Sequence, residues 1–277
     1  MRTGLAAALL LGAAFLLAGA ARAEYGRTPE SHFDAQSLAI DEAKHLGVPL
    51  GADLALLDGQ GRRFALGELF GKPTLLLFSY YSCDGACPTV NRKLAQAIVN
   101  ANRFRPGEDY RVLTVSFDKK DTLAGIRQFV ETLGVAEEDR RGWRFAVFQD
   151  GGDIKRIAES VGYRWFWSVR DRVFVHPNVL IVLSPEGRVA RYLPAASIGP
   201  RDVELALIES DWNRVTNSSR LLDIALGVCF SYSYKEGRYV LNAPLFIAAG
   251  SLTLGIGALI LSLSLFRRFR RREAESA

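Results

Sequence analysis

The central part of this chain lacks any surplus of positive charge, although the 277-residue sequence has a formal net charge of +5. Arg2 and Arg22 flank an apolar run at the N-terminus, and five more arginines lie within the last eleven residues. When these seven arginines and the two glutamates beside the last five are set aside, 28 basic and 28 acidic residues remain. A nucleic-acid groove needs lysines and arginines clustered on the domain itself, so we expect no nucleic-acid partner.

Residues that bind soft metals or carry redox chemistry are scarce, because the chain has three histidines and three cysteines. No internal repeat is visible, which argues against a repeat architecture. Just under half of the residues are hydrophobic, enough for a packed core in one large domain or two small ones.

The N-terminal sequence has the features of a signal peptide. An early arginine is followed by an apolar run from Gly4 to about Ala18 and by the triplet Ala21-Arg22-Ala23. Small residues at both ends of that triplet fit signal peptidase, so we predict a signal peptide in residues 1–23. An uncleaved N-terminal anchor is the alternative, and either version exports the chain that follows.

The C-terminal sequence predicts a transmembrane helix over residues 241–266. No charged residue lies between Val240 and Phe266, and this length can cross a hydrocarbon core of about 30 Å. A soluble helix of this length would show a polar face. Because positive residues that flank a span stay in the cytoplasm, we expect residues 267–277 to be a basic cytoplasmic tail. The main domain would then lie on the periplasmic side of the inner membrane.

Between the two ends, strand-like and helix-like segments alternate in a way that predicts an α/β domain over residues 50–212. Residues 24–49 are expected to be irregular and residues 213–240 to form a juxtamembrane segment. The predicted order is that of a thioredoxin-like fold: strand–helix–strand, an insertion, a hairpin and a final helix. An additional β-hairpin precedes it at the N-terminal side. The predicted hairpin covers residues 54–69, and the predicted strands cover residues 73–81, 110–117, 143–149, 178–184 and 189–193. One helix is predicted to begin at Pro88, and three more to cover residues 123–133, 152–161 and 202–210.

The stretch "FSYYSCDGACPTV" places Cys83 and Cys87 four residues apart, between a predicted strand and a predicted helix. Pro88 suits the first turn of that helix because its missing N–H would be unpaired there. The helix N-terminus favours thiolate over thiol, and thiolate is both a nucleophile and a ligand for soft metals. The pattern therefore fits a redox dithiol, a metal site or a structural disulfide of an exported protein.

A third metal ligand near the two cysteines would favour a metal site over the other two interpretations. Only three histidines are available as candidates for it. His32 and His45 lie in the N-terminal segment, where solvated or capping roles are expected. His176 lies in "VFVHPNVLIVLSPEGRV", just before a predicted strand. In thioredoxin-like folds the loop that enters this strand passes beside the active-site turn and often carries a cis-proline, a place that Pro177 would take. An imidazole with two thiolates suits copper, especially Cu(I).

With these residues the sequence resembles the Sco/SenC family of copper-binding proteins from about Leu54 to Glu209. The resemblance implies a membrane-tethered, exported, thioredoxin-like protein that binds one copper, Cu(I) or Cu(II), through Cys83, Cys87 and His176. It also implies assistance in building CuA, the binuclear copper centre of cytochrome c oxidase. The implied partners are the copper-site subunit of the oxidase and other copper chaperones or thioredoxin-like reductants.

The sequence departs from the family pattern at two places near these ligands. The family usually has a proline and an acidic residue between its cysteines, whereas Asp84 is followed here by glycine and alanine. The family also shows Asp-Pro followed by Arg-Asp-Thr, and "SFDKKDTLAG" keeps Asp118, Asp121 and Thr122 without the proline or the arginine. Asp118 is expected either beside the site or as a solvated acid at the end of a strand.

The chain also resembles a branch of the family with a C-terminal anchor, in which a Cys-aromatic-His-Tyr stretch precedes the membrane. "CFSYSYKEGRY" begins at Cys229 and has Ser231 in place of that histidine. Without the histidine, a metal role for Cys229 has little support. The alternative is a buried or interfacial thiol beside aromatic rings at the membrane surface.

Two functions from different classes remain open on the sequence alone. The first is a copper metallochaperone, and the second is a membrane-tethered thiol–disulfide oxidoreductase that reduces the cysteines of the oxidase copper site. In the second function Cys83 and Cys87 would be the catalytic dithiol. A peroxide-reducing enzyme is disfavoured because no Thr-x-x-Cys after a proline is present around Cys83.

Overall fold

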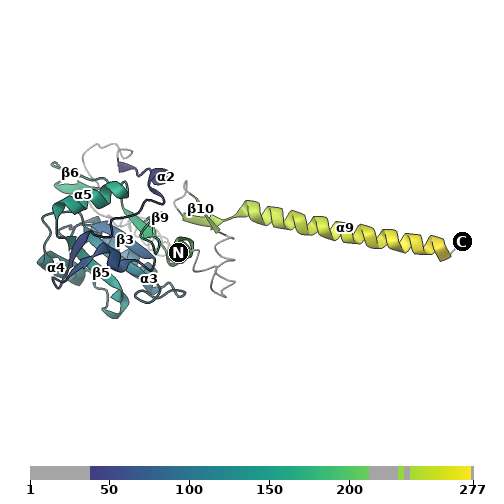
Figure 1. Ribbon diagram of the computed structural model, residues 1–277, viewed down its shortest axis with the longest axis horizontal. Coiled ribbons are helices and arrows are strands. Elements are labelled where there is room, and N and C mark those ends of the chain that lie inside the picture. The colour runs from purple at the N-terminus through teal and green to yellow at the C-terminus, as the bar shows by residue number, and fades with distance from the viewer. Residues whose placement is uncertain (1–37, 212–229, 234–237, 276–277) are drawn as a thin grey trace, which may run out of the picture.

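The computed structural model describes residues 38–211, 230–233 and 238–275. The predicted signal peptide, His32 and Cys229 lie outside the described residues. Within them, the domain and the predicted apolar helix are both present (Figure 1).

A seven-stranded mixed sheet forms the centre of the domain, in the order β2-β1-β5-β4-β3-β8-β9. Strands β3, β4 and β5 run parallel, β8 is antiparallel to β3, and β9 is antiparallel to β8. The first hairpin, β1–β2, joins the sheet through the antiparallel pairing of β1 with β5. The strands are β1 (Ala55–Asp58), β2 (Arg63–Ala65), β3 (Thr74–Ser79), β4 (Arg111–Ser116), β5 (Trp143–Phe148), β8 (Val179–Leu183) and β9 (Val189–Pro194).

Helices cover both faces of the sheet, which explains why its central strands are apolar without alternation. All six residues of β3 are buried, as are five of the six in β4. Helix α3 packs against both α4 and α6, and α5 lies on the opposite face of the sheet (Figure 1). The helices of the domain are α2 (Glu42–His45), α3 (Ala86–Val99), α4 (Leu123–Leu133), α5 (Gly151–Ser160) and α6 (Pro200–Ser210), with short 3-10 turns at Leu66–Leu69 and Glu138–Arg140.

This arrangement is the thioredoxin-like fold that the sequence predicted, and the ends of its helices follow from local chemistry. Thr122 caps α4 by accepting a hydrogen bond from the amide of Gly125 at 3.2 Å. Gly134 ends the same helix in the left-handed conformation, with φ of 62°. The observed limits of α4 are those expected from its apolar spacing.

Three short features were not predicted. The segment expected to be irregular contains α2, one turn capped by Asp41. The insertion before β8 contains a hairpin of β6 (Phe166–Ser168) and β7 (Val173–Val175), and the juxtamembrane segment contains β10 (Phe230–Ser233) and β11 (Arg238–Leu241). Elements of three or four residues are too short to show a hydrophobic period, so the sequence did not reveal them.

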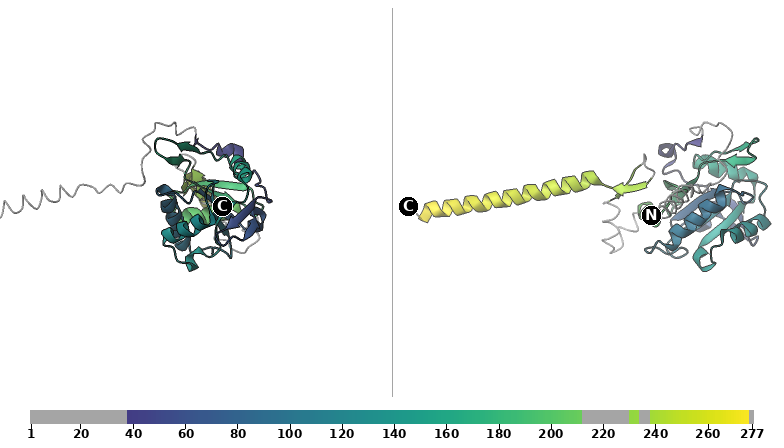
Figure 2. Two further views of the ribbon diagram at one scale, coloured as in Figure 1. Left: turned by 90° about the vertical axis from the view of Figure 1, so that its left-hand side faces the viewer. Right: turned by 180° about the vertical axis from the view of Figure 1, so that it is seen from behind.

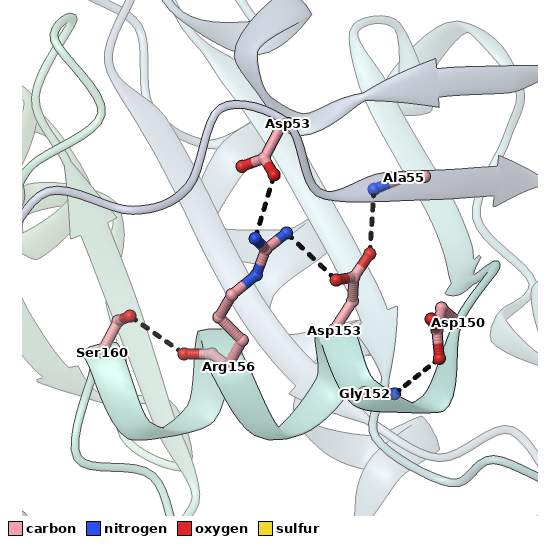
Figure 3. A network of polar contacts seen from close by, with 7 residues as sticks. All are labelled: Asp53, Ala55, Asp150, Gly152, Asp153, Arg156 and Ser160. Atoms are coloured by element: carbon pink, nitrogen blue, oxygen red, sulfur yellow. Dashed lines mark hydrogen bonds and ion pairs between the residues drawn. The ribbon is translucent and has the colours of Figure 1, made fainter.

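A network of charged side chains attaches α5 to the start of β1 (Figure 3). The Asp153 carboxylate accepts a hydrogen bond from the Ala55 amide at 3.3 Å and another from Arg156 at 3.0 Å. Arg156 also donates to Asp53 at 2.9 Å. Arg156 and Asp53 are largely exposed, so we expect this network to orient α5 more than to stabilise the fold.

Helix α9 (Ala243–Glu275) extends away from the domain as one straight helix (Figures 1 and 2). Residues 243–264 are long and apolar enough to cross a membrane, with a mean hydropathy of 2.1 and none of the span buried in the protein. The helix continues past the predicted end of the span at residue 266 and includes most of the segment predicted as a basic tail. A continuous helix is reasonable here because arginine is a good helix former.

The β10–β11 hairpin connects α9 to the domain by packing against α6. The Tyr239 hydroxyl donates to the Glu209 carboxylate at 2.5 Å, and Glu209 also pairs with Arg191 of β9. The Arg201 guanidinium lies 3.9 Å from the centre of the Phe230 ring. These contacts hold the start of the apolar helix against the domain.

The side chain of Tyr81, directly after β3, joins two neighbouring strands in the core. Its hydroxyl lies 3.0 Å from the Thr114 carbonyl oxygen and 2.8 Å from that of Ala146, and it accepts a hydrogen bond from the Ala146 amide at 3.0 Å. The position is closed to solvent, so water cannot replace the hydroxyl. The loop that follows β3 is thereby held to β4 and β5.

We expect Tyr81→Phe to lower the free energy of unfolding by about 1–3 kcal/mol, because it leaves a buried amide and two carbonyls without this partner. Tyr192→Phe is the matched control, since the buried Tyr192 hydroxyl donates to the Val161 carbonyl alone among the described contacts. Its loss should be smaller, about 1 kcal/mol. Urea unfolding of the full chain in detergent measures both, and equal losses would contradict the role given to Tyr81.

Candidate metal centre

The two cysteines lie where β3 ends and α3 begins. Cys83 is in the loop between these elements and is partly exposed, whereas Cys87 is the second residue of α3 and is 3% exposed. Gly85 precedes the helix and supplies no side-chain cap, so the first amides of α3 stay available to the loop. The amide of Gly85 itself donates to the Cys83 sulfur at 3.4 Å. The loop therefore presents one sulfur outward and the other inward.

His176 approaches the same point from the segment between β7 and β8, although it is 89 residues from Cys87 in sequence. It follows β7 and directly precedes Pro177 and β8, and β8 pairs with β3 in antiparallel register. The start of β8 thus lies beside the end of β3. Nε2 of His176 is 3.9 Å from Sγ of Cys87.

Pro177 does not adopt the cis form that is frequent at this place in thioredoxin-like folds, because none of the peptide bonds in the described residues is cis. The trans form is the more stable one for most X–Pro bonds, and the His176 ring reaches the sulfur without the cis form. The expected closeness of this loop to the dithiol holds all the same.

The His176 ring is oriented by groups on the side away from the sulfur. Its Nδ1 is 3.1 Å from the Pro177 carbonyl oxygen and 2.9 Å from the Tyr163 hydroxyl. A carbonyl can only accept, so a hydrogen bond to it places the ring proton on Nδ1 and directs the Nε2 lone pair toward Cys87. Burial lowers the pKa of His176, which keeps the ring neutral and able to bind a metal.

Aromatic rings enclose this imidazole. The centres of the Phe117 and Tyr80 rings lie 5.1 Å and 6.1 Å from that of His176, both in edge-on geometry. Tyr80 and Phe117 also contact each other and Phe174 of β7. These rings cover part of the imidazole, and His176 itself remains partly exposed.

The two thiols differ strongly in acidity. Hydrogen bonding from the Cys87 thiol lowers the pKa of Cys83 to about 6, with a further contribution from the Tyr80 hydroxyl. The same pairing raises the pKa of Cys87 well above its usual range, and burial acts in the same direction. At neutral pH the pair therefore carries one thiolate, on the exposed Cys83.

A chain of buried polar side chains supports Cys87 from below. The Asn91 amide donates to the Cys87 carbonyl at 2.8 Å, and Thr114 donates to the Asn91 side-chain oxygen at 2.9 Å. The indole of Trp143 completes the chain by donating to Thr114 at 3.0 Å. Ser79 is a further partner of the Cys87 thiol. Every member of the chain is buried, so its hydrogen bonds restrict how α3 can begin.

Asp121 holds the loop that carries Cys83. Its carboxylate accepts hydrogen bonds from the Tyr81 amide and the Ser116 hydroxyl, both at 2.6 Å. Asp118, for which the sequence left open a place beside the site or a solvated role at the end of a strand, accepts from the Lys120 amide at 2.9 Å in a local turn. The acid that contacts the loop is therefore the second one of the "DKKD" stretch.

Sequence reasoning missed Tyr163, Tyr80 and Asp121 as residues of this region. Tyr80 belongs to the quoted cysteine stretch, and Asp121 to a motif already noted, so closeness in sequence was an available signal for both. Tyr163 had none, because it reaches His176 from the segment after α5. His45 lies apart from the centre and caps α5, with Nδ1 3.0 Å from the Ser160 carbonyl oxygen.

The distance between Cys87 Sγ and His176 Nε2 can be compared with known metal–ligand bond lengths. Zinc binds at about 2.3 Å from thiolate sulfur and about 2.0 Å from imidazole nitrogen, so an ion of this size bridges such atoms up to about 4.3 Å apart. The 3.9 Å between Cys87 Sγ and His176 Nε2 lies within that range. Cys83 is hydrogen-bonded to Cys87 rather than turned toward the histidine, and no three His, Cys, Asp or Glu side chains in the described part of the chain form a complete cluster.

Several known proteins are similar to this chain in sequence or in fold. The sequence profile of the SCO1/SenC family matches residues 43–207, more than half of the chain. The SCO1 homolog 1 of Arabidopsis thaliana, a mitochondrial protein, is 26% identical over 163 residues, which cover 56% of this chain and 46% of that protein. The chain spans about half the length of the relatives that it matches by sequence.

Solved structures are similar over the domain. A candidate electron transfer protein from Aquifex aeolicus VF5 is 31% identical with a TM-score of 0.55, over 60% of this chain and 95% of that one. The Arabidopsis thaliana ScoI, solved with copper bound, is 22% identical with a TM-score of 0.47, over 60% of this chain and 97% of that one. The Aquifex structure supports the thioredoxin-like fold.

The difference in acidity predicts selective alkylation of the reduced protein. Because the pKa of Cys83 is about 6, its reaction with iodoacetamide should be near its plateau at neutral pH. Below that pKa the rate should fall about tenfold per pH unit as the thiolate is protonated. Mass spectrometry of digested peptides gives the rate for each cysteine. Cys87→Ala removes the hydrogen-bond donor and should shift the profile of Cys83 to higher pH, whereas faster labelling of Cys87 than of Cys83 would contradict the assignment.

Proposed function

This chain belongs to the SCO1/SenC family, and from that premise we propose that it is a copper metallochaperone. It binds one copper ion through Cys83, Cys87 and His176 and passes the ion to the copper-site subunit of cytochrome c oxidase during assembly of CuA. The observation that supports this proposal most is the 3.9 Å approach of Cys87 Sγ and His176 Nε2 from distant parts of the chain.

The donor set favours copper over the commoner hard metals. Two thiolates and one imidazole are soft or intermediate ligands, and Cu(I) prefers such ligands at low coordination number. The neutral His176, held through Nδ1, is ready to donate from Nε2 without losing a proton. Cys83 is the ligand most able to leave or join, because it lies in a loop and is partly exposed.

A second function is a thiol–disulfide oxidoreductase that reduces the cysteines of the oxidase copper site. The unequal pKa values of the two thiols favour it, since an exposed thiolate beside a buried thiol can attack a disulfide and then be released by the second sulfur. Two electrons would pass from the dithiol to the target disulfide, with the protein left oxidised. Thioredoxin-like reductants would then restore the dithiol.

For the membrane, we propose a single-pass inner-membrane protein whose domain, residues 50–212, lies on the periplasmic side. Residues 1–23 act as the signal peptide, residues 213–240 link the domain to the span at residues 241–266, and residues 267–277 lie in the cytoplasm. The apolar span in α9 and the arginines after it support this orientation. Tethering raises the effective concentration of the domain near a membrane-bound recipient. No nucleic acid takes part.

The full chain, purified in detergent and reduced, should bind one copper per chain. His176→Ala should weaken copper binding by more than about a hundredfold, since loss of a partner that merely orients a ligand already costs 10–100-fold. Cys83→Ser and Cys87→Ser should do the same, because a hydroxyl is a poor ligand for soft copper. Competition with a chromophoric Cu(I) chelator measures the affinity.

His45→Gln is the matched control, because His45 bonds to α5 away from the centre and its loss should leave copper affinity unchanged. The reduction of a disulfide peptide by the same variants separates the two functions. Lost copper with intact reduction in His176→Ala supports the chaperone. Tight copper binding by that variant would refute the proposed ligand set. The oxidoreductase function would then be the one that the data favour.

The orientation predicts which part of the chain a protease can reach. Protease added outside spheroplasts should digest the domain and leave intact an epitope tag fused after Ala277, because the arginine-rich end stays in the cytoplasm. Immunoblotting for the tag measures the result, with protease on lysed cells as the control. Loss of the tag in intact spheroplasts would reverse the orientation.

A further inference from the structure

An open groove of about 820 Å³ lies beside the candidate metal centre, between the first turns of α3 and the second half of α4. The loop before α3 forms one end of it. Residues that line the groove include Cys83, Pro88, Thr89, Arg92, Gln128 and Thr132. Its size is within the usual range for ligand clefts in proteins.

The groove gives direct access to one of the three proposed copper ligands. Cys83 lines the groove, whereas Cys87 and His176 are not among the described residues that line it. Cys87 is 3% exposed, and His176 is partly exposed beside its aromatic neighbours. An incoming ligand that enters by the groove therefore meets Cys83 first.

The groove has the polar character that suits a peptide main chain. The Arg92 guanidinium forms part of its wall and donates to the Thr132 carbonyl at 3.1 Å, and Gln128 is an exposed amide with both a donor and an acceptor. The Phe129 ring is a buried, apolar part of the lining. Side-chain donors and acceptors of this kind can pair with the N–H and C=O groups of an extended peptide.

The groove is long enough for a short stretch of extended polypeptide. It runs along α3 from Gly85 to Arg92, which is about 10 Å at 1.5 Å per residue. An extended chain rises about 3.3 Å per residue, so this length accommodates about three residues.

We infer that this groove binds an extended, cysteine-containing segment of the polypeptide that exchanges copper with this protein, with the thiol of that segment placed against Cys83. The inference rests on the proposed chaperone function and specifies where its partner binds. During transfer the incoming thiol loses its proton as its sulfur bonds to copper. The Cys83 sulfur leaves the ion as a thiolate, the proton of the incoming thiol passes to water, and copper remains Cu(I) throughout.

Gln128→Trp tests the groove by filling it without changing a proposed ligand. In the copper-loaded full chain, it should slow copper transfer to a linear synthetic peptide with two cysteines by about tenfold or more, the effect of ~1.4 kcal/mol in the barrier. Transfer to a small Cu(I) chelator and the copper stoichiometry should stay as in the unsubstituted protein. The matched control is Gln96→Trp, the same substitution at an exposed position of α3 outside this groove.

Slower transfer to the peptide alone, and in Gln128→Trp alone, supports the inference. Equal slowing for peptide and chelator, or no slowing, would overturn it. Gln128→Arg repeats the test with a flexible side chain if the tryptophan variant does not fold. If the unsubstituted protein binds no copper, the chaperone function fails, and the rate at which Cys83 reduces the same peptide in its disulfide form still measures the groove.

Discussion

The antiparallel pairing of β8 with β3 is the constraint on which the candidate metal centre depends. Strand β3 ends at the loop with Cys83, and β8 begins just after His176, so antiparallel pairing brings the two ends together. Leu77 pairs with Leu180 and Thr74 with Leu183, and the residues of this register are buried. Both faces of these strands are packed in the core, so a slip by one residue would exchange the side chains of the two faces and lose their packing. The core itself thereby fixes the position of the histidine.

Buried polar groups give this apolar core a defined arrangement beneath the dithiol. The chain from Trp143 through Thr114 and Asn91 to the Cys87 carbonyl satisfies its members in turn, which offsets the cost of burying them. Asp121 holds the preceding loop by accepting from the Tyr81 amide. Packing of Leu, Val and Phe side chains stabilises the domain, but it is these directional bonds that place the two sulfurs differently. One sulfur is consequently shielded and the other is open to a partner.

The domain and the apolar helix are connected by side-chain contacts as well as by the polypeptide chain. Glu209 of α6 pairs with Arg191 of β9 and accepts from Tyr239 of β11, so sheet, helix and juxtamembrane hairpin meet at one carboxylate. Phe230 packs near Leu205 and Ile208 of α6. A domain held at the base of its anchor presents a restricted set of orientations, which favours repeated encounter with a recipient in the same membrane.

By itself the sequence determined the elements with strong periods and the residues with distinctive chemistry. The six-residue apolar strands, the limits of α4, the apolar span and the cysteine pair with Pro88 were all readable, because local sterics and hydrophobic spacing decide them. It did not reveal the β6–β7 and β10–β11 hairpins, the trans bond before Pro177, or Tyr163 behind His176. Only the tertiary structure decided these features. It also decided the unequal acidity of the two thiols and the groove beside Cys83. Each depends on groups far apart in the chain meeting in space, and burial and hydrogen bonding between such groups have no signature in local sequence.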